Sequence, residues 1–364
     1  MIGTKIRQYR LFKRLSLDEL SQRLLGKITK MTLSKYERGV ITPSNQNIFL
    51  IADALDIPVE VLLVPSPFSL NLLSFRKKST LSKRRQDEIK AKLSLNSEKL
   101  LNLFEMMSPD FFSHHNGIEK ISVATMDDVE EAAMQLRSRW NLGAQPIHNL
   151  TSVLENQNIL VLFEDHETEF DGFSAEAIIA NTNYKTGIIV CQQNAPGDRQ
   201  RFSMAHELGH LILEIADDSL DEEKAVNRFA SSFLLPRDMI FQRVGQKRNL
   251  VTYSELKNYK KEFGVSIQAI IYRLKDLSVI STAHYTEWFQ YLTFSGLRIK
   301  EEIILESEKS DRITELIVRA LTEGYIDSQT AVEEYGMESE FAESLDSRTK
   351  YFNYELAEKG GKNE

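Results

Sequence analysis

The sequence has little of what would mark a secreted or membrane-bound protein. Its 364 residues contain one cysteine, Cys191, so no internal disulfide can form, and a reducing cytoplasm is the simplest interpretation. No run approaches the 18 or so uninterrupted apolar residues of a membrane span, and the opening MIGTKIRQYR lacks the apolar stretch of a secretion signal. There is no Gly-rich phosphate loop, no CxxC pair and no internal repeat. We therefore expect a cytoplasmic protein that does not contact a membrane.

The charge of the chain is distributed unevenly. The formal net charge is −8, but residues 1–100 carry a net charge of +10 and the remaining 264 residues carry −18. Solvated helix faces would explain part of this difference. A basic end on an acidic protein nevertheless favours a module at the N-terminus that faces nucleic acid.

The first 65 residues are predicted to form five short helices. Ser16 is a suitable N-cap for a helix over 17–24, and Glu19 completes a capping box. Thr29 caps a further helix over 30–38 in the same way. Two short helices joined by a tight turn inside a small bundle are typical of a helix-turn-helix domain, whose second helix enters the major groove of DNA.

Three stretches in this region, LSLDELSQRL, ITKMTLSKYERG and PSNQNIFLIADALDI, resemble the XRE (phage-repressor-like) family. The resemblance implies that Leu33 and Tyr36 pack inward. It also implies that four side chains of the recognition helix face bases and phosphates: Lys30, Met31, Ser34 and Lys35. A protein-interaction bundle of the same shape is the alternative. Residues 66–120 are predicted to be a basic linker followed by a spacer helix.

Downstream, short β-branched runs alternate with helical patterns. FDGFS (170–174) is predicted to be a turn between the first two strands. The third strand could pair with an extended substrate or could be purely structural, and we read Cys191 within it as a packing residue. The predicted strands cover 159–163, 175–181 and 186–194, and the predicted helices cover 127–140, 146–156 and 199–214.

The stretch MAHELGH (204–210) carries the chemistry of this second region. His206 and His210 are one helical turn apart, so both imidazoles lie on one face and can bind one metal ion. Paired imidazoles suit zinc, which needs a third protein ligand and keeps a fourth position for water. Zinc lowers the pKa of that water to about 7. Glu207, next to the first histidine, can then take the proton of the water as general base.

A third ligand is predicted on the next helix, within LDEEKAVNRFASSFLLP (220–236). Glu223 stands four residues before Asn227, so the two share a helix face. In gluzincin peptidases a glutamate ligand is followed one turn later by a polar residue that hydrogen-bonds a ligand histidine and orients it. We favour Glu223 on this spacing. The rival ligands are Glu222, Asp217, Asp218 and Asp221.

RQRFSMAHELGHLIL followed by EEKAVNRFASSFLLP resembles the ImmA/IrrE family of metallo-endopeptidases, in the subgroup with an N-terminal XRE domain. The stretches WNLGAQPI, FDGFS and VSIQAIIYRLKDLSVIS resemble the same subgroup. The resemblance implies that His206, His210 and Glu223 bind zinc and that Glu207 is the catalytic residue. It also implies a protein substrate, because the characterised activity of the family is cleavage of a DNA-bound repressor.

Some other residues have less certain roles. Arg199 and Arg201 are predicted to be simple surface charges. Several side chains are candidates for stabilising the tetrahedral intermediate of hydrolysis, although core roles are the more favoured interpretation for them. These are His284, Tyr285, Arg273, Tyr253 and Tyr259.

The expected fold class is multidomain and mainly α with a small β-sheet, combining an all-α helix-turn-helix bundle with an α+β, zincin-like peptidase domain. The predicted divisions are a DNA-binding domain (1–65), the linker and spacer helix (66–120), the peptidase domain (121–295), and a helical C-terminal region with a polar tail (296–364).

The expected function is transcriptional regulation coupled to zinc-dependent cleavage of a repressor, a partner protein or the chain itself, in a stress response or mobile element. The alternative is a non-proteolytic regulator or the antitoxin of a toxin–antitoxin pair. The expected partners are operator-type double-stranded DNA, a protein substrate encoded nearby and a second copy in a homodimer.

Overall fold

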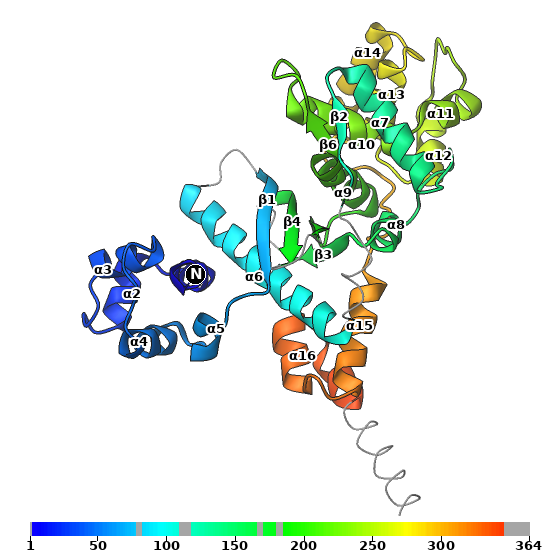
Figure 1. Cartoon of the computed structure of the whole chain (residues 1–364). Coiled ribbons are helices and arrows are strands. Elements are labelled where there is room, and N and C mark those ends of the chain that lie inside the picture. Colours follow the sequence, from blue (N-terminus) through cyan, green and yellow to red (C-terminus); the bar gives the residue numbers. More distant parts are fainter. Residues whose placement is uncertain (1, 78–81, 109–117, 166–169, 180–184, 346–364) are drawn as a thin grey trace, which may run out of the picture.

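The N-terminal region forms the expected small helical bundle (Figure 1). Ser16 and Glu19 make the predicted capping box, and the hydroxyl of Thr29 accepts a hydrogen bond from the backbone N–H of Thr32. Apolar side chains from all parts of the bundle share one core, among them Ile6, Leu20, Leu33, Ile51 and Leu55. Its helices are α1 (Ile2–Phe12), α2 (Leu17–Arg23), α3 (Lys30–Glu37), α4 (Asn45–Leu55) and α5 (Val59–Leu63). The structure, a computed structural model, describes residues 2–77, 82–108, 118–165, 170–179 and 185–345.

A four-stranded mixed sheet forms the centre of the rest of the chain. Its strands follow the order β1-β4-β5-β3, so β1 and β3 are the edges. The pairs β1/β4 and β4/β5 are antiparallel, and the pair β3/β5 is parallel. The strands are β1 (Phe68–Lys77), β3 (Leu160–Glu164), β4 (Phe170–Ile179) and β5 (Lys185–Gln192), and a separate parallel pair is formed by β2 (Ile121–Val123) and β6 (Leu213–Ile215).

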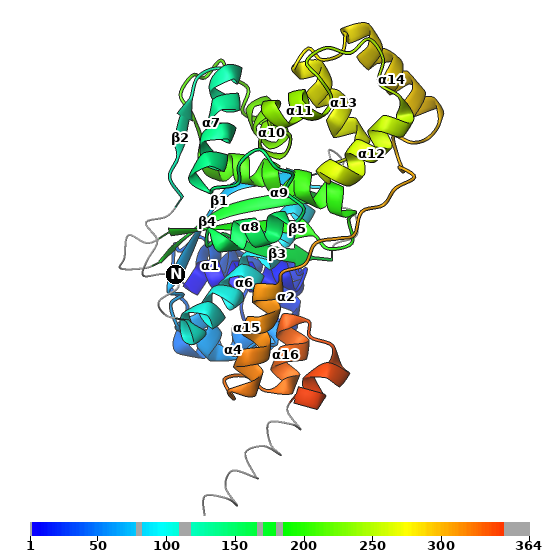
Figure 2. The same ribbon diagram turned by 90° about the vertical axis from the view of Figure 1, so that its right-hand side faces the viewer.

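Helices cover both faces of this sheet, as Figure 2 shows. Side chains alternate along a strand, and Ile189 and Cys191 of β5 therefore join one core while Ile188 and Val190 join the other. The first core is completed by α7 (Met126–Arg139), α8 (Leu150–Asn156), α9 (Gly197–Ile212), α10 (Glu222–Leu234), α11 (Arg237–Arg243), α12 (Tyr253–Phe263), α13 (Ile267–Asp276) and α14 (Thr282–Phe294). The second is completed by α6 (Lys83–Met107), α15 (Asp311–Thr322) and α16 (Ser328–Tyr335).

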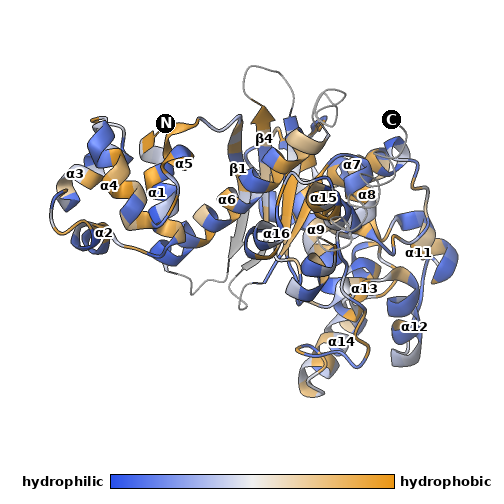
Figure 3. Cartoon of the chain, turned by 90° about the horizontal axis from the view of Figure 1, so that it is seen from below, coloured by the Kyte–Doolittle hydropathy of each residue, from blue (hydrophilic) through white to orange (hydrophobic). Residues whose placement is uncertain are grey.

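The mainly helical fold class with a small sheet is confirmed. In Figure 3 apolar residues, in orange, gather on the central strands, and the surrounding helices carry polar residues in blue. Cys191 is 1% exposed within the core, as predicted. Among the described residues, no helix combines the length and the apolar character needed to cross a bilayer.

Two secondary-structure predictions were wrong. The segment 170–174, predicted as a turn, is the first half of strand β4, because its backbone pairs with β5 on one side and with β1 on the other. The segment 68–77, expected to be linker, is strand β1 and contributes an edge to the sheet. The spacer helix does form, as α6, but it covers a sheet face. Of the expected polar tail, residues 346–364 lie outside the described residues.

The helical bundle contacts the rest of the chain through α6. The ammonium of Lys5 lies 3.5 Å from a carboxylate oxygen of Glu98, and the Arg84 guanidinium donates a 2.8 Å hydrogen bond to the carbonyl of Arg14. Tyr9 is half-buried here, and its partial desolvation together with the charges of Glu98 and Glu334 raises its pKa to about 12. The bundle is thus docked on the same helix that supports the sheet.

Candidate metal centre

Helix α9 presents both histidines of the HELGH stretch on one buried face. His206 is fully buried, and His210 is 8% exposed. The two imidazole rings lie 5.1 Å apart, centroid to centroid, as expected for residues one turn apart. Gly209 lies between them along the helix, and a Cβ there would be only 3.0 Å from Cβ of Val226. The missing side chain therefore lets α10 approach α9.

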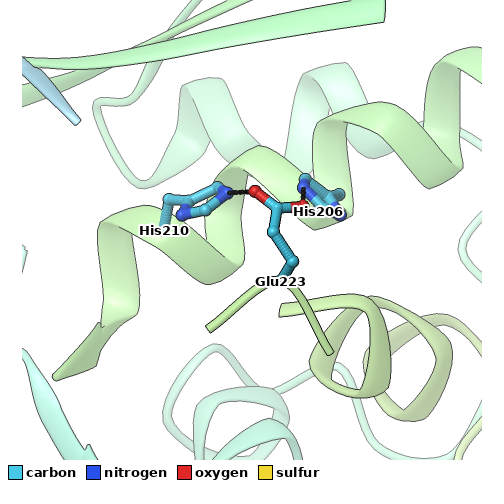
Figure 4. Close-up of side chains that lie close together, drawn as sticks. All are labelled: His206, His210 and Glu223. Atoms are coloured by element: carbon cyan, nitrogen blue, oxygen red, sulfur yellow. Dashed lines mark ion pairs between the residues drawn. The ribbon is translucent and has the colours of Figure 1, made fainter. Parts of the chain in front are cut away.

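Helix α10 brings Glu223 to the two histidines. Asp221 caps the helix by accepting a hydrogen bond from the backbone N–H of Lys224, so that Glu223 falls in the first turn. Figure 4 shows its carboxylate between the two rings. The carboxylate oxygens lie 3.6 Å from Nε2 of His206 and 3.7 Å from Nε2 of His210.

This triad could hold a metal ion. A tetrahedral ion with bonds of about 2.0–2.1 Å holds its ligand atoms about 3.4 Å apart, close to the two separations between Glu223 and the rings. All three ligand atoms lie within 4.8 Å of one another. Nε2 of His210 is buried and has no hydrogen-bond partner among the described residues. Two neutral imidazoles and one carboxylate are a donor set that suits zinc. The three residues therefore fit a zinc ion.

The remaining ring nitrogens are held by two polar residues of α10. Nδ1 of His206 lies 3.0 Å from Oδ1 of Asn227, the partner that the spacing predicts. Nδ1 of His210 lies 3.0 Å from Oε1 of Glu222. Each Nδ1–H that donates to such an acceptor fixes the tautomer in which Nε2 carries the lone pair and faces the triad. Glu222, a rival ligand in the sequence, thus contacts the other side of a histidine.

Asn227→Ala is expected to weaken metal affinity by about 10–100-fold, because His206 would lose the acceptor that orients its ring. Its amide also donates a 2.7 Å hydrogen bond to the carbonyl of Glu223, so the substitution loosens two of the three ligands. Competition with a chromophoric chelator measures the affinity. Asn249→Ala removes an exposed asparagine and is the matched control. Equal affinities in both variants would show that Asn227 does not orient the ring.

Glu207 is positioned between α9 and the sheet edge. It is 1% exposed, and one of its carboxylate oxygens accepts a hydrogen bond from the hydroxyl of Ser74 on β1. On β4, a Cβ at Gly172 would lie 2.6 Å from the other oxygen of Glu207. The glycine within FDGFS therefore makes room for this carboxylate. Glu207 lies beside the triad on the helix but is not one of its three members.

The helix-turn-helix residues lie as the sequence predicts. Leu33 is fully buried and Tyr36 is 5% exposed, while Met31 is 70% exposed. Lys30 and Lys35 are exposed and Ser34 is half-buried. Lys30 also forms a 2.5 Å ion pair with Asp18 of α2. Four side chains named for DNA contact therefore lie on the accessible part of α3.

Comparison with known families agrees with both parts of the structure. The family described as Helix-turn-helix matches residues 6–62, and the peptidase family described as IrrE N-terminal-like domain matches residues 154–275. The chain joins a helix-turn-helix domain to an IrrE-like peptidase domain. No curated protein and no solved structure matched the chain.

Several other residues singled out in the sequence have structural roles. Arg273 is fully buried and forms an ion pair with Glu130, so it is committed to the core. Arg201, predicted to be a surface charge, is also buried and lies 2.6 Å from the carboxylate of Glu308. His284 accepts a 3.2 Å hydrogen bond from the indole of Trp288. None of these contacts reaches the triad.

Strand β5 cannot pair with a substrate, because β4 and β3 already occupy its two edges. The structural interpretation of this strand is therefore the correct one.

Two contacts of the site were missed in the sequence. Ser74 lies far from the motif, and only the pairing of β1 with β4 brings it to Glu207. The contact of Glu222 could have been predicted, because a carboxylate next to a ligand glutamate can accept a hydrogen bond from the second histidine of the pair and orient its ring.

Proposed function

We propose that the chain is a DNA-binding transcriptional regulator with zinc-dependent endopeptidase activity. It cleaves a repressor or partner protein encoded nearby, or itself, and so switches gene expression in a stress response or a mobile element. The single observation that carries this proposal is the convergence of His206, His210 and Glu223 next to the buried carboxylate of Glu207. A helix that only needed polar surface would not bury these groups together.

In the proposed reaction, the chain's residues have separate roles. Nε2 of His206, Nε2 of His210 and the Glu223 carboxylate hold the zinc ion, and Asn227 and Glu222 orient the rings. Zinc, when bound, lowers the pKa of water to about 7 and polarises the peptide carbonyl. The carboxylate of Glu207 accepts a proton from the attacking water and delivers it to the leaving amine nitrogen as the C–N bond breaks.

Cleavage of a candidate partner tests the enzyme proposal. The zinc-loaded chain is incubated with the product of the neighbouring gene, and new termini are sought by mass spectrometry. We expect cleavage that stops when a chelator removes zinc and returns when zinc is restored. If every candidate partner and the chain itself stay intact while transcription is regulated normally, the non-proteolytic regulator or antitoxin is the better account.

The helix-turn-helix domain is proposed to bind operator-type double-stranded DNA through α3. Lys30, Met31, Ser34 and Lys35 form the proposed contact surface, and their exposure and charge support it. A homodimer would match the two half-sites of such an operator. Because DNA and an intracellular repressor are the partners, the proposed place of action is the cytoplasm.

The double variant Lys30→Ala/Lys35→Ala is expected to bind the chain's own promoter more weakly and with a smaller dependence on salt. Two lost phosphate contacts lower the slope of log affinity against log salt by about 1.8. Titrations at several salt concentrations measure this slope. Lys247→Ala/Lys261→Ala removes the same charge from exposed positions of the IrrE-like domain and is the control. An unchanged slope in the α3 variant would exclude these lysines as phosphate contacts.

A further inference from the structure

Strand β1 is supplied to the IrrE-like domain from outside its matched segment. The family match begins at residue 154, whereas β1 is Phe68–Lys77 and follows the helical bundle after residues 64–67. Without β1, strand β4 would be the edge of the sheet on the side of Glu207. Figure 1 shows β1 lying alongside β4. The segment between the two domains therefore covers an edge that borders the catalytic candidate.

The pairing of β1 with β4 is irregular at Ser74, the residue that contacts Glu207. Leu72 lies opposite Ala175 and Ser74 lies opposite Ser174, so Leu73 is the extra residue of a bulge. The bulge changes which face the next side chains take. Leu73 packs against the core that contains α9, and the hydroxyl of Ser74 donates to the Glu207 carboxylate. The bulge is thus the place where β1 brings a side chain, that of Ser74, to the proposed general base.

Few side chains of β1 are fully buried. Of the side chains from 68 to 74, only that of Phe68 is buried, and Leu72 is 39% exposed. The backbone ladder with β4 runs along the strand, and Phe68, Leu70 and Leu73 add contacts with the two cores. Another extended backbone can form the same ladder, which is how β-strand addition captures peptides with little regard to sequence.

We propose that segment 68–77 is an intramolecular pseudosubstrate. It occupies the extended-peptide site along β4. Its Ser74 hydroxyl donates a hydrogen bond to the Glu207 carboxylate and so takes the position of the water that gives its proton to Glu207 in hydrolysis. This inference rests on the proposed peptidase function. Because the segment is tethered within the chain, its effective concentration at β4 exceeds that of free peptides. Release of β1 exposes the edge of β4 and the base together, so that a protein substrate can enter as an extended strand.

Peptide binding to the metal-free full-length chain tests this inference without relying on catalysis. The probe is a fluorescent synthetic peptide with the sequence of residues 68–77, followed by anisotropy. Asn71→Pro/Leu72→Pro should release β1, because ladder hydrogen bonds alternate along a strand and one of two adjacent prolines must remove a donor. Asn71→Ala/Leu72→Ala keeps the backbone donors and is the matched control. We expect the proline variant to bind the probe at least about tenfold more tightly than the wild type and the control.

Equal affinities in all three proteins would overturn the inference. The proposed function is judged separately, by adding zinc and a reporter peptide. If the proline variant binds the probe tightly but neither it nor the wild type cleaves the reporter peptide, the result counts against the peptidase function. The inference that β1 occupies the edge of β4 would still stand.

A disulfide lock decides the question if the proline variant fails to fold. Leu72 and Ala175 are directly opposite, at a separation that a disulfide can bridge, and Cys191 is buried. In Leu72→Cys/Ala175→Cys, oxidation should abolish probe binding and reporter cleavage, and reduction should restore both to wild-type levels. If the oxidised protein binds the probe as well as the reduced protein does, β1 does not guard the site.

Discussion

Replacing Glu207 by glutamine is expected to lower the rate of peptide-bond hydrolysis by about 10²–10⁴-fold, the usual contribution of a positioned general base. Glutamine keeps the size of the side chain and can still accept the hydrogen bond from Ser74. It cannot take the proton of the attacking water. Because Glu207 is not one of the three clustered ligand residues, the zinc content should stay at the wild-type level.

The same chemical change at an exposed position is the control for this experiment. Glu214→Gln alters a carboxylate on β6 that is exposed to solvent, and its activity should equal that of the wild type. Initial rates on one reporter peptide, at equal zinc loading, give the comparison. A Glu207→Gln protein that retains zinc and cleaves at the wild-type rate would remove Glu207 from the reaction.

Arg273→Met is expected to lower the free energy of unfolding by about 3–5 kcal/mol, because it leaves a buried carboxylate without its main partner. Arg273 is fully buried and donates to Glu130, to the hydroxyl of Ser232 and to the carbonyl of Leu235. Burial alone would raise the pKa of Glu130, but the hydrogen bonds and charge of Arg273 outweigh it and lower the pKa to about 2. Because Arg228 also forms an ion pair with Glu130, we expect the loss of stability to be about 3 kcal/mol, the lower limit of this range.

Urea denaturation measures this loss, and a second variant separates the ion pair from packing. Arg273→Met/Glu130→Met removes both charges and should be more stable than Arg273→Met alone. Arg319→Met breaks the exposed pair with Glu323 and should change stability far less. If Arg273→Met unfolds at the same urea concentration as the wild type, the ion pair of Arg273 does not stabilise the core that supports α10 and α13.

Much of the metal centre could be predicted because its information is local. His206 and His210 are one turn apart on a single helix, and Glu223 and Asn227 repeat that spacing on the next. The helical period alone therefore fixes which side chains share a face. The helix starts at Ser16 and Thr29 were predictable for the same reason, since an N-cap is recognised within one turn of sequence.

The parts that were not predicted depend on contacts between distant segments. Residues 170–174 contain Asp and Gly, which favour a turn locally, but pairing on both sides makes them a strand. Ser74 reaches Glu207 across 133 positions of sequence, and Arg201 meets Glu308 across 107. No short-range period encodes such pairs, so β1 looked like linker and Arg201 looked like a surface charge.

The occupied edge of β4 gives the two domains a physical connection. The helical bundle docks on α6, while β1, which enters the sheet, lies between the bundle and that helix in the chain. In the arrangement that we propose, the segment that joins the two domains also closes the peptidase site.

Metal content per chain tests the central claim most directly, because the proposed chemistry depends on zinc held by His206, His210 and Glu223. Elemental mass spectrometry of the purified wild type should find about one zinc ion per chain. Glu223→Gln and His206→Ala should lose it, whereas Glu222→Gln should retain it with reduced affinity, since Glu222 touches only Nδ1 of His210. A wild-type chain that binds no zinc under any loading condition, or a Glu223→Gln variant that keeps a full equivalent, would contradict the account.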